Sequence, residues 1–306
     1  MRPRVANWPA TKDAMPLGPT HGGLAVDCGG RIYCSTDGPR SVLVLEPDGS
    51  VAHQFAPGLA GIHSLTMTEE AGAEFLLCAH LLAHRVVMLT LDGQVVWTLG
   101  APMESGVYQC PEEFKPTAVV KGPEGTLFVA DGYGASVVHQ YDRDRRYVKS
   151  FGGPEAGAGQ LRNCHGLALD TRGPEACLLI CDRRNRRLVH YDLEGRFVGV
   201  LAENLRRPCS AAFGGSSVAV AELEGRVTLL DEQNRVVARI GDNPDTSQWA
   251  QYEALPETWR DDVFIAPHAV CFDTAGNLFV SEWNAQGRLS KIVLDPSVIP
   301  TSHLTQ

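Results

Sequence analysis

The stretch HGLALDTRGPEACLLICDRR, residues 165–184, consists of two short apolar runs joined by a polar turn that contains glycine and proline. A third run, RLVHY (187–191), follows almost at once and mixes apolar with polar residues. Short alternating runs bounded by such turns are typical of β-strands connected as hairpins. No segment of the chain shows a helical period longer than about ten residues. The stretch therefore predicts hairpin-linked strands.

The same pattern occurs six times in the 306 residues, with starts roughly 40 to 60 residues apart. The copies begin at residues 21, 63, 117, 165, 209 and 268. A repeat of about 40–50 residues with four short strands is typical of a β-propeller blade. We therefore predict an all-β fold, a six-bladed β-propeller that occupies residues 1–306 as a single domain.

The last copy contains sequence for only three strands, at 268–273, 277–282 and 288–294. We therefore expect the N-terminal segment around Arg4–Trp8 to supply the fourth strand of that blade and to close the ring. The line FGGPEAGAGQLRNCHGLALD (151–170) resembles the junction between NHL-type repeats, which gives the blades a family name.

Composition narrows the class of protein. Hydrophobic residues make up 44% and charged residues 21%, as in a globular protein with a proper core, and the net charge of −9 argues against a nucleic-acid-binding protein. No apolar run approaches the ~20 residues of a membrane span. The N-terminus has two arginines without an apolar run behind them, so we expect no secretory signal and a cytoplasmic protein. The nine cysteines, none in a CxxC pair, are expected to be reduced thiols.

Histidines occupy one position in alternate copies. Aligning the copies on their first strands places these residues at the same position: Gly22, His63, Thr117, His165, Cys209 and His268. Alternate blades of a six-bladed ring are related by about 120°, so three side chains at this position would converge on the ring axis. Three imidazoles with one open position are a typical catalytic zinc site. Hence His63, His165 and His268 are predicted metal ligands.

Another interpretation of these histidines stays open: each could cap its own strand and hydrogen-bond a neighbouring carbonyl. If a metal is bound, imidazole also suits copper, iron and nickel, but zinc is the expected ion. Cys209 and Cys164 are interpreted as buried apolar residues rather than thiolate ligands. The remaining histidines, including His21, which is one place out of register, are interpreted as structural or surface residues.

With these positions in view, the chain resembles the peptidyl-α-hydroxyglycine α-amidating lyase family over nearly its whole length. The matching segments include NWP (7–9), IHSLTM (62–67), LFVADGYGASVV (127–138), CHGLALD (164–170), CDRRNRRLVHY (181–191) and PHAV (267–270). The resemblance implies a six-bladed propeller whose three histidines hold zinc. It also implies cleavage of the N–Cα bond of a hydroxyglycine, which releases an amide and glyoxylate.

The same resemblance assigns catalytic roles to Tyr133 in ADGYG and Arg183 in CDRRN. Tyr133 would take the hydroxyl proton of the substrate, and Arg183 would hold a carboxylate or steady the phenolate. The alternatives are an amphipathic turn residue for Tyr133 and a solvated member of the run RRNRR for Arg183.

Three departures from the family limit what the resemblance implies. Ala269 stands where the family has a calcium-binding aspartate, which makes a structural calcium doubtful. Gly134 stands where the family has a disulfide cysteine. A substrate-contacting arginine of the first blade has no clear match, and Arg40 is the nearest substitute. These departures favour a small hemiaminal or another hydroxylated acid over a peptide amide.

Two long segments between copies are expected to approach the substrate. The segment 242–267 carries Trp249, Tyr252 and Trp259, which could form an apolar wall or lid over the site, and the segment 103–114 carries Tyr108, which could reach inward. The alternative is that both are surface loops packed by their own aromatic side chains. Trp249, Tyr252, Tyr108 and Arg40 are therefore the predicted substrate-binding residues.

The sequence predicts a zinc-dependent lyase that cleaves a C–N bond of an α-hydroxylated amide or hemiaminal. The expected substrate is a small molecule or a short peptide-like one. A metal-dependent propeller lactonase or related hydrolase and a non-catalytic NHL-type interaction module are the alternatives, because propellers host all three. Acidic residues interrupt the basic run DRDRR (142–146), so neither nucleic acid nor membrane is an expected partner.

Overall fold

The computed structural model describes residues 6–8, 17–155 and 157–294. These residues form 24 β-strands and eight short 3₁₀ helices, and contain no α-helix. The strands make six four-stranded antiparallel sheets, each of which is one blade. This confirms the predicted all-β fold of six β-propeller blades. Within the described ranges, no helix is both long and apolar enough to cross a membrane.

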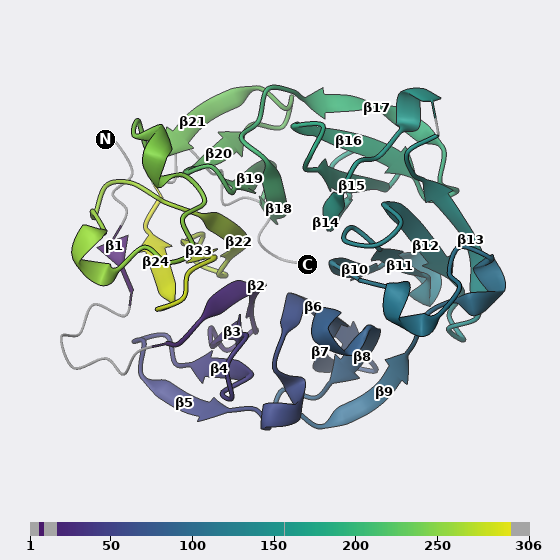
Figure 1. Cartoon of the computed structure of the whole chain (residues 1–306), viewed down its shortest axis with the longest axis horizontal. Helices are drawn as coiled ribbons and strands as arrows, with labels where there is room; N and C mark the ends of the chain where they lie inside the picture. The colour runs from purple at the N-terminus through teal and green to yellow at the C-terminus, as the bar shows by residue number, and fades with distance from the viewer. Residues whose placement is uncertain (1–5, 9–16, 156, 295–306) are drawn as a thin grey trace. The chain divides into compact units, whose positions relative to one another are not determined.

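The chain divides into two compact units. The first unit comprises Met1–Ala60 and Cys209–Gln306, and the second comprises Gly61–Pro208. In the second unit, blade 2 contains β6 (Ile62–Glu70), β7 (Ala73–His80), β8 (Arg85–Leu89) and β9 (Val95–Leu99). Blade 3 contains β10 (Ala118–Lys121), β11 (Leu127–Ala130), β12 (Val137–Tyr141) and β13 (Tyr147–Gly152). Blade 4 contains β14 (Cys164–Asp170), β15 (Cys177–Asp182), β16 (Arg187–Asp192) and β17 (Phe197–Ala202). In each of these three blades the strands pair in sequence order (Figure 1).

The first unit contains the other three blades. Blade 1 contains β2 (Thr20–Val26), β3 (Ile32–Thr36), β4 (Val42–Leu45) and β5 (Val51–Gln54). Blade 5 contains β18 (Pro208–Gly214), β19 (Ser217–Glu222), β20 (Arg226–Leu230) and β21 (Val236–Ile240). Blade 6 contains β22 (Pro267–Phe272), β23 (Leu278–Glu282), β24 (Arg288–Ile292) and β1 (Ala6–Asn7).

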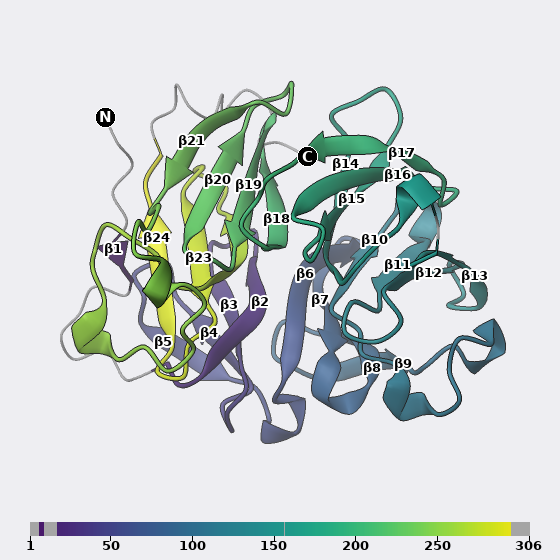
Figure 2. The same cartoon turned by 45° about the horizontal axis from the view of Figure 1, so that its top comes forward.

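Blade 6 takes its fourth strand from the other end of the chain. β1 pairs antiparallel with β24, with Ala6 opposite Lys291 (Figure 2). The backbone N–H of Trp8 donates to the carbonyl of Leu289 at 2.8 Å. The Trp8 ring then packs edge-on against Phe279, 5.2 Å between centroids. Arg4, where the sequence-based segment begins, lies outside the described residues.

Strand position within a blade explains the sequence pattern. The second strand of blade 4, CLLICD, is an almost unbroken apolar run because both of its faces are buried, whereas half-buried and exposed positions alternate along most of the outer strand β17. Leu178, Ile180 and Val189 belong to one core cluster, and each of these three side chains is fully buried. Truncating Ile180 to alanine would cost about 2–5 kcal/mol, because the removed methyl groups leave a cavity. This packing gives the site residues a rigid support.

Candidate metal and catalytic site

Each of the three predicted ligand histidines lies at a β-bulge. In blade 2 the pairing of β6 with β7 shifts between Ile62 and Ser64, so His63 is an extra residue on its strand. The pairing shifts in the same way around His165 and around His268. A bulged residue leaves the regular ladder, which re-aims its side chain. All three side chains are almost completely buried, at 1–2% exposure.

His63 is oriented by a neighbouring blade. Its Nδ1 lies 2.7 Å from the carbonyl oxygen of Thr117. Because a carbonyl only accepts, Nδ1 must carry the proton, which leaves the Nε2 of a neutral ring with its lone pair available. This Nε2 lies 3.4 Å from the Tyr133 hydroxyl. The interpretation of His63 as a residue bonded to a neighbouring carbonyl is therefore compatible with ligation.

His165 approaches the same phenol oxygen from another side. Its Nε2 lies 3.0 Å from the Tyr133 hydroxyl. The rings of His63 and His165 are 4.6 Å apart between centroids, at an interplanar angle of 69°. Two imidazole nitrogens therefore flank one phenol oxygen within the second unit.

Arg183 completes this cluster. Its Nη1 donates to the Tyr133 hydroxyl oxygen at 3.3 Å, and its guanidinium carbon lies 5.2 Å from the centre of the Tyr133 ring. The side chain is only 8% exposed, so it is not a solvated member of the RRNRR run. The structure thus brings together four of the predicted site residues: His63, Tyr133, His165 and Arg183.

The turn that carries Tyr133 requires glycine on both sides of the tyrosine. A Cβ atom at Gly132 would collide with the carbonyl of Cys164, and one at Gly134 would collide with the carboxylate of Asp131. The turn therefore has no room for the cysteine that the amidating-lyase family carries at the position of Gly134. Burial raises the pKa of Cys164 well above its usual value, which favours the neutral thiol over a metal-binding thiolate.

Asn163 joins the turns of Tyr133 and Arg183. It adopts a left-handed backbone conformation, with φ of 64°. Its side-chain amide donates to the carbonyl of Gly132, and its own carbonyl accepts from the backbone N–H of Arg183 at 3.1 Å. Sequence reasoning missed this residue. Its only signal is its place two residues before His165, and asparagine tolerates the left-handed conformation better than most residues.

Buried acids anchor the backbone just ahead of two of the bulged histidines. Asp182, at the end of β15, accepts from the backbone N–H of Arg162 at 2.8 Å and from Arg187 Nε at 2.8 Å. Glu282, at the end of β23, accepts from the backbone N–H groups of Ile265 and Ala266 at 2.6 and 2.7 Å. These contacts hold the entrances of β14 and β22.

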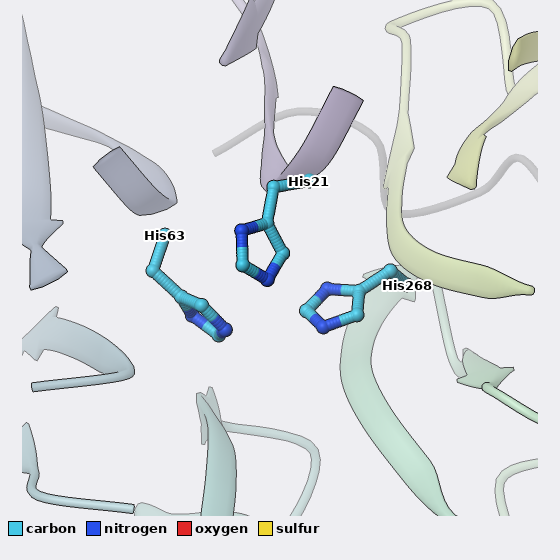
Figure 3. Close-up of side chains that lie close together, drawn as sticks. All are labelled: His21, His63 and His268. Atoms are coloured by element: carbon cyan, nitrogen blue, oxygen red, sulfur yellow. The ribbon is translucent and has the colours of Figure 1, made fainter. Parts of the chain in front are cut away.

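In the first unit, His268 lies beside His21. Their ring centroids are 4.9 Å apart, and a nitrogen of one ring lies within 4.8 Å of a nitrogen of the other (Figure 3). His21 Nδ1 also lies 3.0 Å from an oxygen of Asp37, an arrangement common among metal-bound histidines. Sequence reasoning treated His21 as structural because it is out of register. The irregular pairing of β2 between Thr20 and Leu24 explains the offset.

The predicted substrate-binding residues differ in their surroundings. The ring centroid of Tyr252 lies 4.8 Å from that of Trp283, and the Trp283 centroid lies 6.4 Å from that of His21. Trp283 therefore links Tyr252 to the His21–His268 pair. The Trp249 ring N–H instead donates to the carbonyl of Asn243 within its own loop, at 3.0 Å. Arg40 is half-buried in the turn between β3 and β4.

Tyr108 does not reach inward as the sequence led us to expect. It is 7% exposed, and its hydroxyl donates to Asp131 at 2.7 Å and lies 2.6 Å from His139 Nε2. The side chain belongs to a core cluster with Phe114 and Val129. A buried hydroxyl with two protein partners is a structural group rather than a substrate contact.

No family model matches the chain. Solved structures of similar fold include virginiamycin B lyase from Staphylococcus aureus, crystallised in a catalytically inactive form with quinupristin. It is 13% identical, with a TM-score of 0.59, and the match covers 96% of this chain and 99% of that chain. A luciferin-regenerating enzyme is 12% identical, with a TM-score of 0.63 and 95% of each chain covered. A putative gluconolactonase is 16% identical, with a TM-score of 0.60 and 95% and 97% covered. At these identities the similarity shows the fold alone: this chain has the β-propeller fold of these three proteins.

Proposed function

We propose that the protein is a zinc-dependent lyase that cleaves a C–N bond of an α-hydroxylated amide or hemiaminal. The observation that carries this proposal is the position of the Tyr133 hydroxyl, which has His63 Nε2 at 3.4 Å, His165 Nε2 at 3.0 Å and Arg183 Nη1 at 3.3 Å. A phenol held among two imidazoles and a cation is suited to proton transfer beside a metal.

The donor set fits zinc. Histidine ligands to zinc usually donate their second ring N–H to a carbonyl or carboxylate, and His63 makes this contact with Thr117 at 2.7 Å. His63 and His165 would each offer Nε2, and the repeat register assigns His268 as the third ligand. When bound, zinc would supply a Lewis acid that polarises the substrate hydroxyl. Calcium is not part of the proposal, because Ala269 offers no ligand oxygen from its side chain.

The chain's own residues would then move protons and charge. Tyr133 would accept the proton of the substrate hydroxyl. As that oxygen becomes a carbonyl, the carbon–nitrogen bond breaks and the departing nitrogen takes up the proton that Tyr133 accepted, so the products are an amide and an α-keto or aldehyde acid. Arg183 would stabilise the negative charge on the phenol oxygen through its hydrogen bond.

The substrate would be a small molecule or a short peptide-like one, and neither nucleic acid nor membrane is proposed as a partner. Two of the proteins of similar fold are named for other activities, virginiamycin B lyase and a putative gluconolactonase. A metal-dependent lactonase is therefore the second candidate. A non-catalytic interaction module is the third candidate, but such a module would not require the Tyr133 cluster.

Metal analysis followed by a substrate panel separates these candidates. We expect about one zinc per chain, turnover of α-hydroxyglycine derivatives, and no opening of lactones. Tyr133→Phe should keep the zinc and lose turnover, because it removes only the proton acceptor. Lactone opening without cleavage of hydroxyglycine derivatives would favour the lactonase, and purified protein without metal would refute the zinc enzyme.

A further inference from the structure

Blade 3 lacks an ion pair that three other blades share. In blades 4, 5 and 6 an acid at the end of the second strand pairs with an arginine that begins the third strand. The pairs are Asp182–Arg187, Glu222–Arg226 and Glu282–Arg288, at 2.8–2.9 Å. In blade 3 the acid is Asp131, which directly follows β11, but β12 begins with Val137, which offers no charge. Asp131 is nevertheless fully buried.

In blade 3 a tyrosine hydroxyl from outside the four strands of the blade bonds the acid in place of an arginine. Tyr108 belongs to the segment between β9 and β10, and its hydroxyl donates to Asp131 Oδ2 at 2.7 Å. Burial raises the pKa of Asp131 above its usual value, although the hydrogen bond from Tyr108 works in the opposite direction. The carboxylate therefore depends on neutral donors instead of a cation.

A chain of hydrogen bonds through Tyr108 ends at this carboxylate, and in each bond the donor is the group farther from Asp131. Because the Tyr108 proton goes to Asp131, His139 Nε2 must donate to the Tyr108 oxygen, at 2.6 Å. Burial lowers the pKa of His139 to about 4, so the ring is neutral at pH 7. Its Nδ1 then accepts from Ser150 at 2.8 Å, and Ser150 accepts from Tyr147 at 2.8 Å.

Asp131 in turn fixes the turn that carries Tyr133. Its Oδ1 accepts from the backbone N–H of Lys115 at 2.7 Å, and its Oδ2 accepts from that of Ala135 at 2.6 Å. The Tyr133 N–H donates to the Lys115 carbonyl at 3.4 Å. A change in the position of the carboxylate would therefore move the backbone on both sides of Tyr133.

We infer that Tyr108 and His139 are positioning residues for Tyr133 and act through Asp131. The inference rests on the proposed catalytic role of Tyr133 only for its effect on turnover. Its structural part, that the Tyr108 hydroxyl holds the turn 131–135 in place, can be tested without any substrate.

The matched pair of variants is Tyr108→Phe and Tyr141→Phe. Both remove a buried tyrosine hydroxyl from the same core cluster, but the Tyr141 hydroxyl has no hydrogen-bond partner among the described residues. Hydrogen exchange measured by mass spectrometry on the zinc-loaded protein gives the first readout. We expect exchange in the peptide covering 131–136 to become about tenfold faster in Tyr108→Phe, the effect of losing one charge-assisted hydrogen bond. We expect no change there in Tyr141→Phe.

Turnover gives the second readout. Tyr108→Phe should lower kcat at unchanged KM and zinc content, and His139→Gln should retain most of kcat because an amide can both donate and accept. His139→Leu should behave like Tyr108→Phe. If Tyr108→Phe speeds exchange at 131–136 but the wild-type protein has no lyase activity, the proposed function is refuted and the structural part of the inference is supported. Unchanged exchange in Tyr108→Phe, or strictly additive effects of Tyr108→Phe and Asp131→Asn on exchange, would overturn the inference.

Discussion

The guanidinium of Arg183 lies 3.3 Å from the hydroxyl oxygen of Tyr133, at the end of a side chain that is 8% exposed. A lysine at this position would keep the charge but lose the planar fork that reaches the phenol. We therefore expect Arg183→Lys to reduce kcat by about tenfold to a hundredfold, the worth of one hydrogen bond to a charged group. Zinc content should not change, because Arg183 is not a proposed ligand. Arg184→Lys, an exposed neighbour, is the control in the same kinetic assay.

Removing a bulged histidine should remove the metal. His165→Ala deletes one of the two Nε2 atoms next to Tyr133, and we expect the zinc content measured by mass spectrometry to fall from about one per chain to near zero. His53→Ala in β5 changes a histidine outside the site and should retain zinc. Equal zinc content in the two variants would contradict the assignment.

Asp37 should matter for the metal although it is not a proposed ligand. Its carboxylate lies 3.0 Å from His21 Nδ1, and His21 lies against His268. The loss of a carboxylate that bonds a metal ligand directly typically lowers metal affinity by about 10–100-fold. Because His21 is not a proposed ligand and acts only by packing against His268, we expect Asp37→Asn to weaken zinc binding by less than this factor in a chelator competition titration. Asp48→Asn, an exposed carboxylate in the β4–β5 turn, should leave the affinity unchanged.

Stability should depend on pH through His139. Burial lowers the pKa of this side chain to about 4, below the ordinary value of 6.5. As the pH falls, the unfolded chain therefore binds a proton on this histidine before the folded protein does. The stabilisation that the neutral His139 ring contributes is complete above about pH 6.5 and is lost as pH falls through about 4. The loss amounts to about 2 kcal/mol at pH 5.

Urea unfolding at pH 7 and pH 5 measures this effect. His139→Gln keeps a donor and an acceptor but cannot be titrated, so its free energy of unfolding should fall by about 2 kcal/mol less than that of the wild type between these pH values. Asp131, whose pKa is raised by burial, acts in the opposite direction in both proteins and cancels in the comparison. Parallel pH profiles would show that His139 is not neutral in the folded protein.

The turn of Tyr133 should not tolerate a methyl group. Gly134→Ala would push a Cβ into the carboxylate of Asp131, and we expect a loss of about 1–3 kcal/mol in the free energy of unfolding. At Gly100 a Cβ would meet no atom within 4 Å, so Gly100→Ala should be close to neutral. Comparable unfolding curves for the two variants would argue against the tight approach of Asp131.

The sequence predicted the blades because strand pairing within a blade is local, so each hairpin leaves a pattern of alternation and turn residues. The register of the copies also singled out His63 and His165. The remaining interactions join residues far apart in the chain: Asn163 bonds the backbone of Gly132, and Tyr108 bonds Asp131. Hydrogen bonds from side chains to partners far away in the sequence leave no periodic pattern from which they could be predicted. His21 was not predicted to lie beside the site because the irregular pairing of β2 displaces it by one position from the register of the other histidines.

The bulges at His63, His165 and His268 have a consequence for how such a protein can change over evolutionary time. Each histidine is a residue that the ladder does not need, since the strand resumes regular pairing directly after it. Mutation can therefore replace these residues without changing the pairing of the strands, and selection can alter the chemistry of the propeller while its blades stay the same.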